Sequence, residues 1–279
     1  MSTAFTEPTK NTAPGFSAEA KKHLGQNFLH ERGVIDKIVL AVDPQPGDVI
    51  VEIGPGQGAL TFPLLRRHGE LTAIEFDRDL HAPLQAAARE HGMLHLIAGD
   101  VLSVDFSALA AQRADADGRI RLVGNLPYNL SSPILFHALD HAAAIRDMHF
   151  MLQKEVVERM ASGPGSKVYG RLSVMLQAYC TVMPLFTVPP GAFRPAPKVD
   201  SAVVRLLPTP ANRIEVIDRR VFANVVRAAF GQRRKTLRNA LNGVADSAQI
   251  EAAGVRPDAR AEQVEVAAFV RMANLLCAE

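Results

Sequence analysis

Short runs of β-branched and other apolar residues recur between residues 49 and 207, and the intervals between the earlier runs are long enough to hold a helix. The runs are VIVEI (49–53), LTAIE (71–75), LHLIA (94–98), RIRLV (119–123), MHFML (148–152) and SAVVRLL (201–207). Strands that alternate with helices form βαβ units, and such units build a mostly parallel sheet covered by helices on both faces. The sequence therefore predicts an α/β fold.

A smaller helical region is predicted after the last of these runs. PTPAN (208–212) has the composition of a linker, and no β-rich run follows it. The apolar residues that come next recur at helical spacing: Val221, Phe222, Val225, Val226, Ala229 and Phe230. The opening MSTAFTEPTKNTAPGF is rich in Thr, Pro and Ala, as flexible tails are. We expect a tail over residues 1–15, an α/β domain over 16–207 and a helical domain over 208–279.

The composition is that of a globular chain, with 48% hydrophobic and 22% charged residues. Cys180 and Cys277 form no CxxC motif or Cys/His cluster, so we expect free thiols in a reducing compartment and no metal site. The most apolar stretch, SVMLQAYCTVMPLFTV, contains Gln177 and Pro184, which favours a core helix followed by a strand over a membrane span. No export signal is visible, so the expected location is the cytoplasm, with no membrane partner.

The positive charge of the chain is concentrated in one block. The net charge is only +2, but residues 213–238 contain eight Arg and Lys against two acids, hence +6, and the rest of the chain therefore sums to −4. A local basic block attracts polyanions. Because a single run of charge is more often a solvated helix face, this block does not by itself predict nucleic-acid binding.

VEIGPGQGAL places three glycines between a predicted strand and a predicted helix. Glycine permits a sharp turn and a close approach of the backbone to a ligand, and the helix that follows offers free N–H groups. Polar residues also follow the next three strands: Glu75, Asp100 and Asn125. Because the carboxyl ends of parallel strands line one crevice, these four loops can converge on one ligand. Taken singly, Glu75 and Asp100 can also be read as helix caps.

Two ligands present a ribose and an adenine to such a crevice, a nicotinamide dinucleotide and S-adenosylmethionine. Glu75 can accept hydrogen bonds from both ribose hydroxyls, and Asp100 or its neighbouring backbone can read the adenine amino group. GPGQG lacks the third glycine of the dinucleotide fingerprint, and Glu52 places an acid where a pyrophosphate would be repelled. S-adenosylmethionine carries a sulfonium and an ammonium and no phosphate. The acid therefore favours S-adenosylmethionine.

GNLPYN (124–129) directly follows RIRLV, at the place where the methyl group of such a donor would point. An exocyclic adenine amine is a poor nucleophile because its lone pair is delocalised into the ring, so it must be held in line with the methyl group. The Asn125 side-chain oxygen and the backbone carbonyl of Leu126 or Pro127 can each accept an N–H from the amine. Tyr128 is one of three Tyr in a chain without Trp, and it would stack on a base flipped out of its helix.

These residues carry a close resemblance that extends from about Lys21 to the C-terminus. The chain resembles the ribosomal RNA adenine N6,N6-dimethyltransferases, in particular their bacterial small-subunit branch. The matching stretches are HLGQNFL, VEIGPGQGALT, IEFDRDL, GDVL, GNLPYN, LQKEVVERM, YGRLSV, FRPAPKVDSAVVRL and GQRRKTLRNAL. Of these, GNLPYN, PKVDSAV and QRRKTLRN are specific to that family. The resemblance implies a Rossmann-like S-adenosylmethionine-dependent methyltransferase sheet with a small C-terminal helical domain.

The resemblance also implies roles for individual residues. In such enzymes the donor is bound by a set of positions that maps here onto Asn27, Leu29, Gly54, Glu75, Asp100 and Asn125. The target adenine is held by the NLPY turn and by a second aromatic, which maps onto Phe193 in FRPAPK. From the residues alone, Phe193 can also be read as filling a gap in the core. Leu126 departs from the wider adenine amino methylase pattern, which has two prolines before the aromatic.

The implied substrate is a pair of neighbouring adenosines in a hairpin near the 3′ end of 16S rRNA, each dimethylated inside an immature small ribosomal subunit. Four transfers are needed, so the pocket must also accept an amine that already carries a methyl group. The basic block would then contact RNA phosphates through Arg227, Arg233, Arg234, Lys235 and Arg238, although some of these side chains can instead brace the domains. We expect a monomer that contributes to small-subunit maturation.

Three alternatives remain at this point. The first is an oxidoreductase that binds a nicotinamide dinucleotide in the same crevice. The second is a non-enzymatic assembly factor that binds RNA and inspects the maturing subunit. The third is a relative that methylates large-subunit rRNA and confers antibiotic resistance, against which QRRKTLRN and PKVDSAV argue by resemblance.

Overall fold

The structure of the chain, a computed structural model, describes residues 19–21, 24–113, 118–208, 215–232 and 234–277. The predicted tail, all of the PTPAN linker beyond Pro208, and Arg233 lie outside these residues. The chain forms two compact units. The first comprises the chain up to Gln153 together with Phe186–Val203, and the second comprises Lys154–Leu185 together with the chain from Val204 onward. The domain boundary predicted after residue 207 remains a prediction. The two units show which residues pack together, and they do not show which parts of the chain are independent domains.

The six β-rich runs all form strands. The elements of the first unit are β1 (Phe28–Leu29), α1 (Arg32–Val42), β2 (Ile50–Ile53), α2 (Thr61–His68), β3 (Glu70–Glu75), α3 (Arg78–Ala88), β4 (Met93–Ala98), η2 (Val101–Ser103), α4 (Phe106–Arg113), β5 (Ile120–Asn125), α5 (Ser131–Asp140), η3 (Ala142–Ala144), β6 (Ile145–Gln153), η4 (Pro190–Ala192) and β8 (Phe193–Arg194). Strands β7 (Cys180–Val188) and β9 (Ser201–Pro208) contribute residues to both units.

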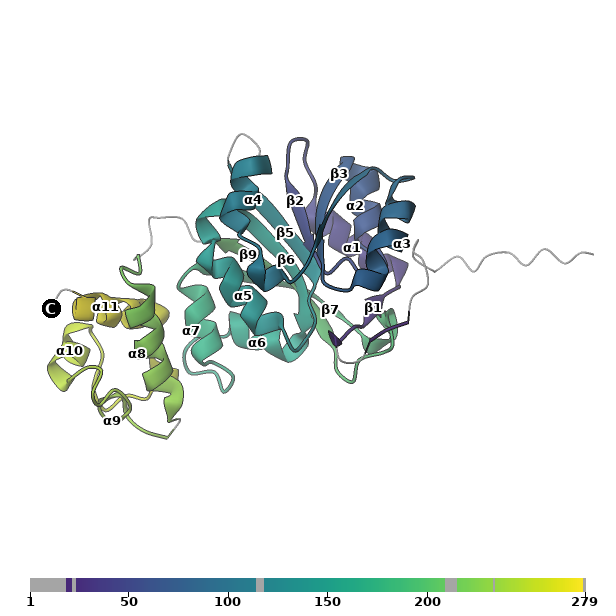
Figure 1. Cartoon of the computed structure of the whole chain (residues 1–279). Helices are drawn as coiled ribbons and strands as arrows, with labels where there is room; N and C mark the ends of the chain where they lie inside the picture. The colour runs from purple at the N-terminus through teal and green to yellow at the C-terminus, as the bar shows by residue number, and fades with distance from the viewer. Residues whose placement is uncertain (1–18, 22–23, 114–117, 209–214, 233, 278–279) are drawn as a thin grey trace, which may run out of the picture. The chain divides into compact units, whose positions relative to one another are not determined.

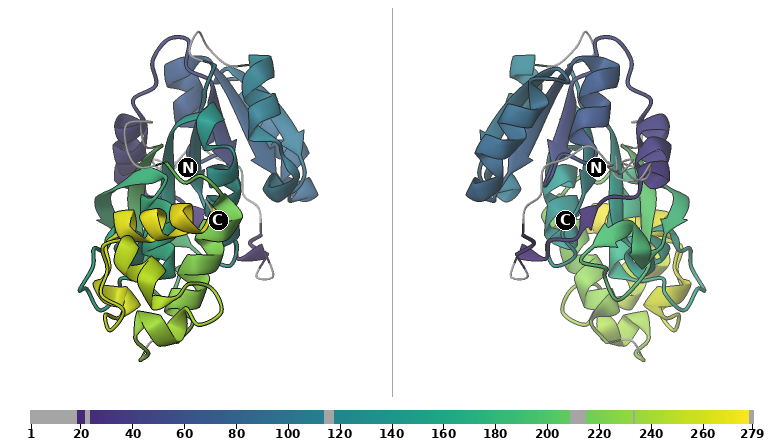
Figure 2. Two further views of the ribbon diagram at one scale, coloured as in Figure 1. Left: turned by 90° about the vertical axis from the view of Figure 1, so that its left-hand side faces the viewer. Right: turned by 90° about the vertical axis from the view of Figure 1, so that its right-hand side faces the viewer.

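The main sheet has seven strands in the order β4-β3-β2-β5-β6-β9-β7 (Figure 1). The pairs β2/β3, β3/β4, β2/β5 and β5/β6 are parallel, and helices lie on both faces of the strands (Figure 2). The predicted α/β fold with a parallel sheet is confirmed. The chain order reverses between β2 and β5, and a crevice forms at the carboxyl ends of the strands beside such a reversal.

The central strands are buried along almost their whole length. Every residue of β2 is buried, and so is every residue of β5 up to Gly124. Strands that helices cover on both faces have continuous apolar runs rather than alternating ones, which is why these segments could be recognised in the sequence. Helices α2 and α3 pack on β3, and α3 also packs on β4.

Strand β5 runs two residues further than predicted, through Gly124 to Asn125. A Cβ atom at Gly124 would lie 2.6 Å from the carbonyl oxygen of Ile53 in β2. Glycine therefore lets the two strands stay paired to their ends, where a larger residue would separate them. The predicted strand therefore ended too early, because Gly124 serves close packing within the sheet.

The second unit is mostly helical. Its helices are α6 (Lys154–Ala161), α7 (Arg171–Gln177), α8 (Arg219–Gly231), α9 (Leu237–Ala240), α10 (Ser247–Ala252), the 3₁₀ turn η5 (Ala261–Gln263) and α11 (Val266–Cys277). Asp218 caps α8 by accepting hydrogen bonds from two backbone N–H groups. The predicted inward face of α8 is confirmed, since Phe222, Val225, Val226 and Ala229 are buried, and α8 packs against α11.

The stretch SVMLQAYCTVMPLFTV forms the end of α7 followed by β7, as predicted. Pro184 lies inside β7, which is at the edge of the sheet, where a missing backbone N–H is tolerated. Among the described helices, none combines the length and apolar character that crossing a membrane requires.

Replacing Gly124 by Ala is expected to lower the melting temperature, because the new methyl group must push apart the backbones of β2 and β5. Overpacking of this kind typically costs about 1–3 kcal/mol. Gly163→Ala is the matched control, since no atom lies within 4 Å of its added Cβ. Thermal unfolding of both variants decides the point: equal melting temperatures would contradict the close packing that we assign to Gly124.

Candidate functional site

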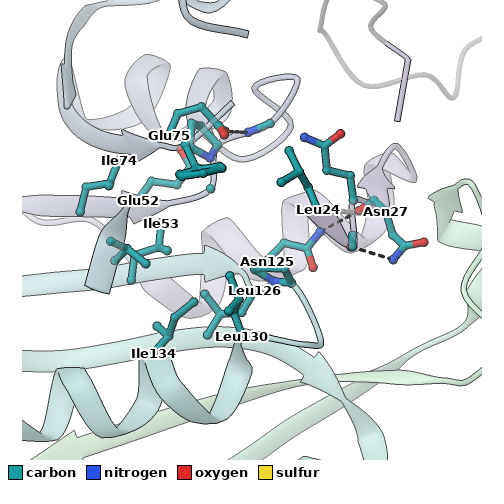
Figure 3. Close-up of a pocket in the computed structure, with 18 of the residues that line it drawn as sticks. Leu24, Asn27, Glu52, Ile53, Ile74, Glu75, Asn125, Leu126, Leu130 and Ile134 are labelled. Carbon is teal, nitrogen blue, oxygen red and sulfur yellow. Dashed lines mark hydrogen bonds between the residues drawn. The ribbon is translucent and has the colours of Figure 1, made fainter. Parts of the chain in front are cut away.

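A cavity of about 310 Å³ opens at the carboxyl ends of the central strands of the first unit (Figure 3). It is lined by loops that follow β2, β3, β4 and β5 and by the segment from Leu24 to Leu29. The predicted donor and adenine residues that line it are Asn27, Leu29, Gly54, Glu75, Asp100, Asn125, Leu126, Pro127 and Tyr128. The structure therefore brings all of these predicted residues together, and Phe193 is not among those that line the cavity.

The glycine loop and Glu75 form one wall. Gly54 and Gly56 have φ values of 67° and 56°, a backbone conformation that glycine adopts without strain. Glu75 is 6% exposed, and its carboxylate accepts hydrogen bonds from the backbone N–H of Gly56 (3.1 Å) and of Asp77 (2.8 Å). Burial raises the pKa of Glu75, and these two hydrogen bonds oppose the shift. The side chain is thus fixed as a buried acceptor at the cavity wall.

The capping interpretation fits Asp100 but not Glu75. Asp100 caps η2 by accepting a hydrogen bond from the backbone N–H of Leu102 at 2.9 Å. Helix α3 is capped by Asp77 instead of Glu75. Asp100 also lines the cavity, so capping fixes its position at the wall without removing it from the site.

Glu52 is a second buried acid in the cavity wall, and Thr61 donates a hydrogen bond to it at 2.6 Å. Burial raises the pKa of Glu52 to about 8; the hydrogen bond from Thr61 opposes the shift, and the charge of Glu75 adds to it. A cation bound beside this carboxyl group would favour its ionised form. The pair of acids therefore suits a ligand that carries both a positive charge and a ribose, as S-adenosylmethionine does.

The segment from Leu24 to Leu29 closes another side of the cavity. Asn125 donates a hydrogen bond through its Nδ2 atom to the backbone carbonyl of Asn27 at 3.0 Å (Figure 3). No local residue pattern predicts this segment as part of the site, and only the family resemblance predicts Asn27 and Leu29. Its other cavity residues, including Gln26 and Phe28, were missed entirely, because no pattern in the sequence marks a loop that reaches the site from a distance.

The turn after β5 presents distinct polar groups to the cavity. The Pro127 carbonyl already accepts hydrogen bonds from Leu130 N (3.0 Å) and Ser131 Oγ (3.1 Å), so of the two predicted carbonyl acceptors only the Leu126 carbonyl stays a prediction. The Tyr128 hydroxyl shares a hydrogen bond with Ser201 Oγ at 2.8 Å. This bond fixes the half-buried ring at the cavity wall.

Phe193 does not line the cavity itself, although its strand partner Leu29 does. It is 2% exposed, pairs with Leu29 between β8 and β1, and belongs to the hydrophobic core. In this structure Phe193 fills the core, which is the alternative interpretation of its role given above. Its stacking on the adenine stays a prediction.

The predicted phosphate contacts lie in the second unit. Arg227 is exposed on α8, where it donates a hydrogen bond to Asn224 at 2.7 Å. Arg234, Lys235 and Arg238 are exposed around the start of α9, while Leu237 and Leu241 are fully buried. The two buried leucines therefore anchor this stretch of chain, so that its cations face solvent. Arg233 lies outside the described residues.

Replacing Glu52 by Gln is expected to raise the melting temperature by several degrees at about pH 9 and much less at about pH 5. The pKa of Glu52 rises from 4.5 to about 8 on folding, so between these values the folded protein holds a proton that the unfolded chain has lost. Stability therefore falls as the pH rises through this window, whereas the amide of the Glu52→Gln variant does not titrate. Thermal unfolding across this range, with exposed Glu90→Gln as control, tests this; a difference that is independent of pH would contradict it.

Comparison with known proteins agrees with this site. The model of the ribosomal RNA adenine dimethylase family matches residues 17–278. A ribosomal RNA small subunit methyltransferase A from Xanthomonas campestris is 71% identical over 93% of this chain and 97% of its own length. The crystal structure of a dimethyladenosine transferase from Plasmodium falciparum has a TM-score of 0.75 at 25% identity, covering 88% of this chain and 95% of its own. The 23S rRNA methyltransferase ErmE shares the fold, with a TM-score of 0.68 at 24% identity over 90% of this chain and 100% of its own. The chain belongs to the ribosomal RNA adenine dimethylase family.

Proposed function

We propose that this protein transfers methyl groups from S-adenosylmethionine to the N6 amines of two adjacent adenosines in a hairpin near the 3′ end of 16S rRNA, within the immature small ribosomal subunit. The observation that carries the proposal is the position of Asn125. Its amide stands at the end of β5, at the wall of the cavity that Glu75 and Gly54 also line, so donor and amine residues share one cavity.

The residues present fit the donor. S-adenosylmethionine supplies an electrophilic methyl group when it is bound. Glu75 accepts hydrogen bonds from the ribose hydroxyls, and Gly54 leaves room for the ligand beside the backbone, with only the Asn125 carbonyl oxygen as close as 4.0 Å to its absent Cβ. The carboxyl group of Glu52 balances the positive charge that the donor brings into a buried cavity.

The turn after β5 orients the attacking amine. Asn125 Oδ1 and the Leu126 carbonyl each accept one N–H, which directs the nitrogen lone pair toward the methyl group. With the donor bound, the S–C bond would break as the N–C bond forms, the neutral thioether S-adenosylhomocysteine would be the leaving group, and the methylated nitrogen would release its proton to water. Tyr128 stacks on the adenine, and its hydrogen bond to Ser201 holds the ring in place. Stacking offsets part of the cost of flipping the base out of its helix.

The exposed cations of the second unit supply RNA affinity. Arg227, Arg234, Lys235 and Arg238 carry charge into solvent, as contacts to phosphate require, and the family resemblance adds Arg233 to the residues expected to contact phosphate. Such contacts hold the RNA without reading its sequence. Recognition of the target then depends on the shape of the folded RNA.

The comparisons support the small-subunit substrate. Relatives at 71% identity are named for the small subunit, whereas the 23S rRNA methyltransferase is 24% identical. Membership of a methylase family removes the support for an oxidoreductase. The assembly-factor role is compatible with methylation, since an enzyme that waits on a maturing subunit performs both. We further propose that the protein acts as a monomer in the cytoplasm and contributes to small-subunit maturation.

The deciding experiment incubates the protein with S-adenosylmethionine and small subunits that lack the modification, then digests the rRNA and measures dimethyladenosine by mass spectrometry. We expect dimethyladenosine at the adjacent pair with the unaltered protein. Asn125→Ala should still bind subunits, but its rate of methyl transfer should fall at least about a hundredfold, because one of the two amine acceptors is gone. Subunits that are bound but never methylated by the unaltered protein would favour the assembly factor alone.

Replacing Arg234, Lys235 and Arg238 together by Ala is expected to weaken RNA binding and to flatten its dependence on salt, since fewer counterions are released. The measurement is the dissociation constant for the rRNA hairpin at a series of salt concentrations. Arg256→Ala, whose side chain is 82% exposed outside the basic block, is the control and should behave as the unaltered protein does. Parallel salt dependences for the triple variant and the control would exclude these three cations from the RNA contact.

A further inference from the structure

Asp77 links the N-terminal segment of the described chain to the donor side of the cavity. Its side chain is only 4% exposed, and its carboxylate accepts a hydrogen bond from Lys21 Nζ at 2.6 Å and from Gln26 Nε2 at 2.9 Å. Lys21 Nζ also contacts the carboxylate of Asp79 at 2.6 Å, and the backbone N–H of Lys21 donates to Gln26 Oε1 at 2.8 Å. Two side chains from the N-terminal segment thus converge on one buried acid.

The same acid touches the donor site. The backbone N–H of Asp77 donates to Glu75, the carboxylate assigned to the ribose. Although burial raises the pKa of Asp77, the hydrogen bonds from Lys21 and Gln26 outweigh this effect and lower it. Asp77 therefore stays ionised at neutral pH and remains a fixed anchor for both partners.

The residue after Gln26 touches the amine site. The backbone carbonyl of Asn27 accepts the hydrogen bond from Asn125 Nδ2 at 3.0 Å, and the Asn27 side chain donates to the Gly25 carbonyl at 3.3 Å. A Cβ atom at Gly25 would lie 2.9 Å from Asn129 Oδ1, so this segment also packs directly on the turn after β5. On its other side it is held by the pairing of β1 with β8.

The Asn27 carbonyl decides which way the Asn125 amide faces. A carbonyl oxygen only accepts hydrogen bonds, so Nδ2 of Asn125 must face it, and Oδ1 is left to face away. If Asn27 shifted, the amide could rotate and present N–H groups to the target amine, whose own N–H groups it would then repel. The orientation of Asn125 thus depends on a backbone atom one residue from the Gln26 anchor.

We propose that Lys21 and Gln26 are positioning residues for methyl transfer, which act through Asp77 and the Asn27 carbonyl on the amide of Asn125. This inference rests on the proposed function, and it assigns a role in the reaction to Lys21, which does not line the cavity. It also explains why a segment ahead of the first long helix of the described chain is part of the site.

The test compares single-turnover methyl transfer to undermethylated small subunits at saturating S-adenosylmethionine and saturating subunits. Lys21→Met should lower this rate about tenfold, since misplacing a catalytic group by about 1 Å can cost up to about a hundredfold in rate. Lys21→Arg keeps the charge and should restore most of the rate. Gln26→Leu removes the second bond to Asp77 and should act in the same direction as Lys21→Met. Lys37→Met, an exposed change on α1, is the matched control.

Measuring the rate at saturation separately from the KM for S-adenosylmethionine distinguishes a positioning role in the reaction from a role in donor binding alone. A Lys21→Met protein that reaches the unaltered rate at saturation, with only a higher KM for S-adenosylmethionine, would overturn the inference. So would failure of Lys21→Arg to restore the rate. Absence of transfer by the unaltered protein is a different outcome: it would refute the proposed function and this inference with it.

Discussion

The site depends on the parallel pairing of β2 with β5 at the point where the strand order reverses. Gly54 begins the loop after β2, and Asn125 is the last residue of β5, so pairing these strands to their ends places the two residues next to each other at the wall of one cavity. The pairing persists to the end because Gly124 has no side chain to press on the Ile53 carbonyl. A backbone constraint in the sheet thus sets the geometry of donor and amine.

Two buried acids give this cavity its chemical character. Glu75 is held in place by two backbone N–H groups, whereas Glu52 has the Thr61 hydroxyl as a donor and a pKa raised to about 8. A buried carboxyl group is costly to ionise without a partner. A cationic ligand compensates that cost, whereas a pyrophosphate would add to it. The two buried acids therefore favour a cationic methyl donor as the ligand of this cavity and disfavour a dinucleotide.

The sequence was most informative where local pattern decides the structure. The buried strands were recognisable as apolar runs, and Glu75, Asp100 and Asn125 were nominated because each follows or ends one of them. Asn27 could not be found in this way, because its contact with Asn125 spans 98 residues and uses a backbone carbonyl that has no sequence signature. The two residues that β5 adds to the predicted run could not be found either, since sequence does not show which neighbour the missing side chain of Gly124 makes room for. The sequence around Phe193, FRPAP, likewise contains no pattern that places this residue in the core.

The most direct test of this account is a crystal structure of the protein with bound S-adenosylmethionine. We expect the ribose hydroxyls on Glu75, the adenine beside Asp100 and the methyl group directed toward Asn125, whose amide still donates to the Asn27 carbonyl. A ligand bound outside this cavity, or an Asn125 amide turned away from Asn27 with the donor in place, would contradict the account.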